Sequence, residues 1–137
     1  VFHLLDVSRG AAFGDIDNDG DVDVLVSNTN GPPRLMINQV SENAHWLGLR
    51  LLGAETRRDM VGATVEIHRP GEPLLWRRAR ADGSYASAND PRVHIGLGAS
   101  DTPPTVRITW PNGRTETWTE IALDRWTTLV EGTGTAP

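Results

Sequence analysis

Short runs in which apolar and polar residues alternate are the feature that most restricts how this chain can fold. In the run 46–52, three leucines alternate with Gly48 and Arg50. This period of two, typical of a strand with one buried face, recurs in 62–69, 92–98 and 105–110. No window of a dozen residues holds a helical stripe, and 120–126 allows one helical turn at most. The pattern therefore predicts many short strands, with a further β-rich strand at 22–28.

Turn-forming residues separate these runs. They comprise Asn30–Pro33, Pro70-Gly71, Asp82-Gly83, Pro103-Pro104 and Pro111–Gly113. The segment 105–118 predicts a hairpin in which Gly113 adopts a positive φ and Trp110 packs near Trp118. Close spacing of strands and turns indicates an all-β fold, either a β-sandwich or a barrel-like domain.

Composition excludes several classes of function. The chain of 137 residues has a formal net charge of −5, and five of its 18 acidic residues lie within 15–23. Without a concentrated basic surface, a nucleic-acid partner is not expected. There is no apolar run long enough for a membrane span and no cysteine, which excludes disulfides and thiolate chemistry. Because the chain has no initiator Met, we expect it to be cut from a longer precursor.

The sequence GDIDNDGDVD (14–23) places an aspartate at every second position. The five aspartates are Asp15, Asp17, Asp19, Asp21 and Asp23. Two carboxylates about 5 Å apart repel by roughly 3 kcal/mol at an effective dielectric constant near 20, so several converging charges need a compensating cation or full solvation. Calcium favours six to eight oxygen ligands in an adaptable shell, and Gly20 permits the tight wrap that such a shell requires.

We therefore predict a calcium loop. Asp15, Asp17, Asp19 and Asp23 would bind through their carboxylates and Asp21 through its backbone carbonyl. The spacing matches the first half of an EF-hand loop, but position 12 is Val26 instead of glutamate and both flanks alternate as strands. Magnesium suits the site less well because it needs strict octahedral geometry. The alternative is a solvated acidic turn.

The segment 10–39 resembles an FG-GAP or VCBS repeat, the calcium-loop unit of integrin-like β-propellers. All five aspartate positions of that motif are present, and PPRLMINQ resembles its next strand. The remainder resembles the ASPIC/UnbV domain through HWLGLRLLG (45–53), RRDMVGATVEI (57–67), GSYASANDPRVHIGLG (83–98) and VRITWPNGRTETW (106–118).

These resemblances imply a domain plan and a setting. Residues 1–39 would form a partial propeller blade, 40–132 an ASPIC/UnbV-like β domain and 133–137 a flexible tail, with a polar seam at 38–45. The other blades would lie upstream in a larger secreted, periplasmic or cell-surface protein. The implied function is a non-enzymatic, calcium-binding interaction module with a protein or glycan ligand.

Two alternatives depend on other residues. Five tryptophans (46, 76, 110, 118 and 126) or the polar loop 84–92 suggest a carbohydrate-binding module, although tryptophans in a sandwich are more often buried. A hydrolase would use a site around Ser87, Asp90 or the scattered histidines. The basic run 76–82 could bind an anionic polymer, but the pattern favours a solvated strand face or one paired with acids such as Glu116.

Overall fold

The computed structural model describes residues 6–40 and 44–136, and every regular element in these ranges is a β-strand. The all-β prediction is therefore confirmed. No helix in the described ranges is long and apolar enough to cross a membrane. The chain forms two compact units: Val1–Ser41 joins Ala81–Asp90 in the first, and Glu42–Arg80 joins Pro91–Pro137 in the second. The middle of the expected seam, 41–43, lies outside the described residues.

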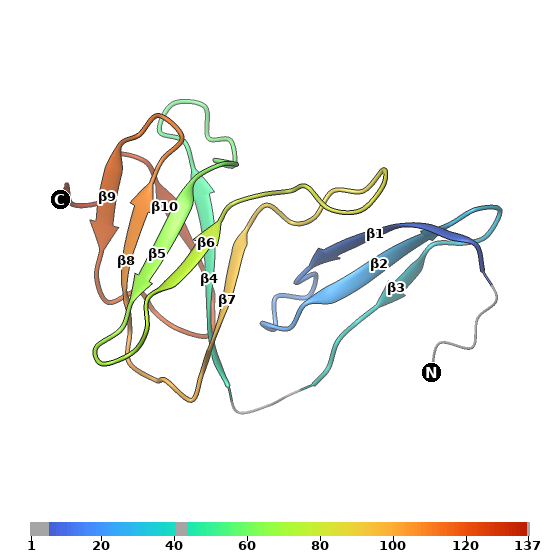
Figure 1. The fold of residues 1–137 in the computed structure, drawn as a ribbon, viewed down its shortest axis with the longest axis horizontal. Helices are drawn as coiled ribbons and strands as arrows, with labels where there is room; N and C mark the ends of the chain where they lie inside the picture. Colours follow the sequence, from blue (N-terminus) through green and yellow to red (C-terminus); the bar gives the residue numbers. More distant parts are fainter. Residues whose placement is uncertain (1–5, 41–43, 137) are drawn as a thin grey trace. The chain divides into compact units, whose positions relative to one another are not determined.

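The first unit is built on a three-stranded antiparallel sheet in the order β1-β2-β3 (Figure 1). Its strands are β1 (Ser8–Gly14), β2 (Asp23–Asn28) and β3 (Arg34–Met36). The strand expected at 22–28 and the one after it are thus both present. Val24 of β2 lies between Phe13 of β1 and Met36 of β3, so β2 is the central strand.

The second unit contains two open sheets (Figure 1). One has the order β10-β4-β7, with β4 (His45–Leu52), β7 (Val93–Gly98) and β10 (Trp126–Val130). The other has the order β6-β5-β8-β9, with β5 (Thr64–His68), β6 (Leu75–Arg78), β8 (Thr105–Thr109) and β9 (Thr115–Trp118). All neighbouring pairs are antiparallel except β10 and β4.

These two sheets share one hydrophobic core, which makes the second unit sandwich-like. Leu47, Leu49 and Ile95 from the first sheet belong to the same buried cluster as Val65 and Ile108 from the second. Each is fully buried, and each occupies the inward position that the alternating pattern predicts. The sandwich, and not the barrel-like alternative, is the architecture observed.

The hairpin predicted at 105–118 is confirmed. Gly113 has φ 86°, and its N–H donates to the carbonyl of Trp110 (2.8 Å). The rings of Trp110 and Trp118 meet edge to face, with centroids 6.1 Å apart. The loop chemistry and the cross-strand pair therefore agree with the sequence pattern.

Glu116 lies on the buried side of this hairpin, where its carboxylate accepts the N–H of Gly132 (2.9 Å). Its ion pair is with Arg114 (3.1 Å), not with the basic run 76–82. The segment expected to be a flexible tail hydrogen-bonds to the sandwich, because the backbones of Thr135 and Thr117 donate to each other's carbonyl oxygens.

Candidate functional site

The aspartate-rich loop connects β1 to β2 at the end of the first hairpin (Figure 1). Gly14, the last residue of β1, pairs with Asp23, the first residue of β2. The intervening residues lie in bends outside any strand. The hairpin thus closes directly below the acidic cluster and fixes both ends of the loop.

Two of the aspartates are buried and hold the loop together. Asp15 is 3% exposed, and its two carboxylate oxygens accept the backbone N–H groups of Asp19 (3.1 Å) and Gly20 (3.0 Å). Asp23 is fully buried and accepts the N–H of Ile16 (2.8 Å) and of Asn38 (2.8 Å). Charged oxygens make strong hydrogen bonds to N–H groups, so these side chains order the loop and secure the segment after β3.

The backbone of the loop turns where its residue types allow it. Asn18 has φ 64° and Gly20 has φ 98°, both in the left-handed region that asparagine and glycine enter most readily. The N–H of Asp21 donates to Oδ1 of Asp19 (2.9 Å), a local turn typical of aspartate. Gly20 therefore has the conformational role that the sequence assigned to it.

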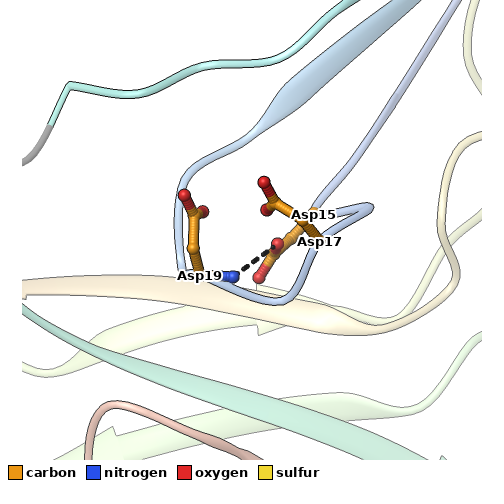
Figure 2. Close-up of side chains that lie close together, drawn as sticks. All are labelled: Asp15, Asp17 and Asp19. Carbon is orange, nitrogen blue, oxygen red and sulfur yellow. Dashed lines mark hydrogen bonds between the residues drawn. The ribbon is translucent and has the colours of Figure 1, made fainter.

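Asp15, Asp17 and Asp19 converge on one point (Figure 2). One carboxylate oxygen from each lies within 4.8 Å of those from the other two. Partial desolvation and the neighbouring carboxylates Asp19 and Asp23 raise the pKa of Asp17 above its ordinary value, although its side chain is exposed. The loop therefore concentrates negative charge at the mouth of the turn.

The geometry of this cluster fits a calcium ion. Oxygen ligands of calcium lie about 2.3–2.6 Å from the metal, so two of them are at most about 4.6–5.2 Å apart. The three oxygens lie within 4.8 Å of one another, so a single ion could contact all three.

The other two predicted ligands are placed differently. Neither Asp21 nor Asp23 belongs to the group of converging carboxylates found among the described residues. For Asp21, the expected donor is a backbone carbonyl, so its side chain need not enter the cluster. Asp23 binds two backbone N–H groups, and its role as a metal ligand stays a prediction.

A contribution that the sequence did not indicate comes from Ala81–Asp90, which packs along β1 within the first unit. The N–H of Phe13 donates to Oδ1 of Asn89 (3.0 Å), and the N–H of Asp90 donates to the carbonyl of Phe13 (3.0 Å). A Cβ atom on Gly14 would lie 2.8 Å from the Cβ of Asp90. This segment therefore holds the backbone immediately before the first aspartate of the loop.

The only local signals for this contact were the two glycines within β1, Gly10 and Gly14, and the turn-forming pair Asn89-Asp90. They indicated a turn before β7, but not which strand this turn would contact.

The residues considered for a hydrolase lie beside other groups. The Ser87 hydroxyl donates to the carbonyl of Tyr85 (3.1 Å), His45 lies beside Asp124, and His68 lies beside Glu66. His3 lies outside the described residues.

The five tryptophans divide by exposure. Trp110 and Trp46 are buried, and Trp118 and Trp126 are half-buried. Trp126 also has the guanidinium of Arg92 over its ring, 3.8 Å from the centroid. Trp76, on the edge strand β6, is 53% exposed. Of the tryptophans proposed as a glycan platform, Trp76 is therefore the one whose ring is mainly open to solvent.

The described residues thus define an all-β protein with a sandwich unit and a hairpin unit that ends in an acidic loop. The family model described as ASPIC and UnbV matches residues 53–136, more than half of the chain. The chain therefore belongs to the ASPIC and UnbV family. A search of the curated proteins gave no match. The matched region contains β5 to β10 and begins after the aspartate loop, which it does not include.

Proposed function

We propose that this chain is a non-enzymatic, calcium-stabilised binding module of an extracellular or cell-envelope protein. The observation that supports it most is the convergence of Asp15, Asp17 and Asp19, whose oxygens lie at separations suited to one calcium ion. The resemblance of residues 10–39 to an FG-GAP or VCBS repeat supports the same metal. In this proposal the ion has a structural role and lets three carboxylates share one turn.

The proposal assigns further ligands to the same loop. Asp21 would add its backbone carbonyl, and Asp23 would add a carboxylate oxygen beside its two hydrogen bonds. Water would complete the six to eight oxygens that calcium takes. Asp15 and Asp23 already order the loop, so the calcium site would be largely preformed. Little of the binding free energy would then be spent on ordering the chain.

Thermal unfolding tests the proposal directly. A metal that binds only the native state adds RT ln(1 + [L]/Kd), about 2.7 kcal/mol at a hundredfold excess over Kd. Excess calcium should therefore raise the Tm by several degrees, and EGTA should reverse the change. Asp17→Ala should abolish this response because it removes one exposed carboxylate of the converging group, while the buried Asp15 and Asp23 that hold the loop stay in place.

Asp101→Ala is the matched control, since Asp101 is an exposed aspartate in the other unit. Its response to calcium should equal that of the wild type. Identical melting curves for the wild type in calcium and in EGTA would refute the calcium site. An equal response to magnesium would show a cation site without the proposed selectivity.

A further inference from the structure

The outer face of the sheet β6-β5-β8-β9 presents an ordered set of exposed groups. Because Val65, Ile67 and Val106 point into the core, the residues that alternate with them point outward. The strand register places Trp76 opposite Glu66 and Glu66 opposite Arg107. A second row places Arg78 opposite Thr64 and Thr64 opposite Thr109. We call these six residues the outer platform.

Trp76 is the least expected member of the outer platform. Its side chain is 53% exposed on an edge strand, and the residue opposite it, Glu66, is charged. Leu74, just before this strand, is also 53% exposed. A large aromatic side chain that contributes little to a core is a typical anchor for a ligand, since its ring offers a rigid apolar face.

The outer platform also carries positive charge in a protein whose net charge is −5. Arg78 and Arg107 are exposed, and the ion pair of Arg107 with Glu66 is long, at 4.0 Å. In the part of the chain that the structure describes, no ion pair is found for Arg78. With neighbouring strands about 4.8 Å apart and a rise of about 3.4 Å per residue, the backbone positions of Arg78 and Arg107 lie within about 10 Å of that of Trp76.

We propose that the outer platform binds an acidic polysaccharide. The indole of Trp76 would stack on the apolar face of a sugar ring, while Arg78 and Arg107 pair with carboxylate or sulfate groups of neighbouring sugars. Arginine suits this task because its planar fork binds such groups through two hydrogen bonds. Thr64 and Thr109 supply hydroxyl groups that both donate and accept hydrogen bonds with sugar hydroxyls.

The position of Glu66 favours a polysaccharide over a nucleic acid. This carboxylate lies in the middle of the first row and repels any anionic group placed against it. A polysaccharide can place a sugar hydroxyl there while its acidic groups reach Arg78 and Arg107, whereas a nucleic acid carries a phosphate at every nucleotide. The inference extends the proposed role as a binding module, on which it rests. It uses no residue of the calcium loop, since all six members belong to the second unit.

Binding of the purified chain to immobilised hyaluronan, dextran sulfate and neutral dextran tests the proposal. We expect hyaluronan or dextran sulfate to bind at least about tenfold more tightly than dextran, and the affinity to fall as salt rises. Trp76→Ala and the double variant Arg78→Ala/Arg107→Ala should each weaken binding by about tenfold. Arg125→Ala, which removes an exposed arginine outside the outer platform, should leave it unchanged.

Repeating the measurements in EGTA separates this proposal from the calcium site. Polysaccharide binding that persists in EGTA supports the outer platform even where the melting curve shows no calcium response. Failure of both anionic polymers to bind would overturn the inference, as would equal binding of dextran or tighter binding of single-stranded DNA. Unchanged affinity in folded Trp76→Ala, with a wild-type Tm, would also overturn it.

Discussion

Replacing Glu116 by alanine should destabilise the sandwich more than any exposed acidic substitution. Glu116 is 1% exposed and accepts hydrogen bonds from the N–H of Gly132 (2.9 Å) and the indole N–H of Trp110 (3.3 Å). Alanine leaves both donors without this acceptor, at about 1–3 kcal/mol each. Loss of the ion pair with Arg114, whose side chain is 59% exposed, adds at most about 1 kcal/mol. The expected loss of unfolding free energy is therefore about 2–7 kcal/mol.

Urea unfolding followed by tryptophan fluorescence suits this test because Trp110 contacts Glu116 directly. With an m value of about 1–3 kcal/mol/M, a loss of 3 kcal/mol lowers the midpoint by about 1–3 M. Glu116→Gln keeps the shape and one acceptor oxygen, so its loss should be smaller, about 1–2 kcal/mol. Exposed Glu55 provides the control variant Glu55→Ala. A free energy of unfolding for Glu116→Ala within about 0.5 kcal/mol of the wild-type value would refute the argument.

Three further predictions concern other parts of the molecule. Gly48→Ala should cost about 1–3 kcal/mol by overpacking, because its Cβ would lie 2.6 Å from Cε3 of Trp126; an unchanged Tm would contradict this. Asn89→Ala should accelerate hydrogen exchange at the amide of Phe13, which loses its acceptor, while core amides keep their rates; equal rates at Phe13 would count against this contact. Asp124 accepts hydrogen bonds from the His45 side chain and from the backbone N–H of Trp46, and these lower the pKa of Asp124 below its ordinary value of 3.8. The ionised Asp124 therefore stabilises the native state above pH 3.8, and this stabilisation is lost as the pH falls through the lowered native pKa. Asp124→Asn should therefore reduce the Tm at pH 7, and its difference from wild type should disappear in acid; a difference independent of pH would exclude this ionisation.

The sequence predicts local features of the second unit well because their causes are local. Alternation places Leu47, Leu49 and Val65 on buried faces because one face of each sheet is covered. The hairpin around Gly113 needs only a short turn and a cross-strand pair. For the same reason the tight turn at Gly20 is visible in the sequence.

Features that depend on distant pairing could not be predicted in this way. The parallel pairing of β10 with β4 joins residues almost eighty positions apart. The sequence of β10 has no strict alternation of apolar and polar residues that would predict a strand there. The burial of Glu116 follows from donors that the fold brings to it, not from its neighbours in sequence. A glutamate between two threonines has the pattern of an exposed strand residue, so the sequence alone favours the wrong environment.

The contact of Ala81–Asp90 with β1 also bears on how the chain is made. The hairpin β1–β2 leaves the ribosome before the segment that supplies Asn89 and Asp90, which begins about fifty residues after β2. At 5–20 residues per second, that interval lasts roughly 3–10 s. During synthesis the acidic loop would therefore spend seconds without the residues that hold its N-terminal strand. A fragment that stops before residue 81 would remain permanently in that unfinished state.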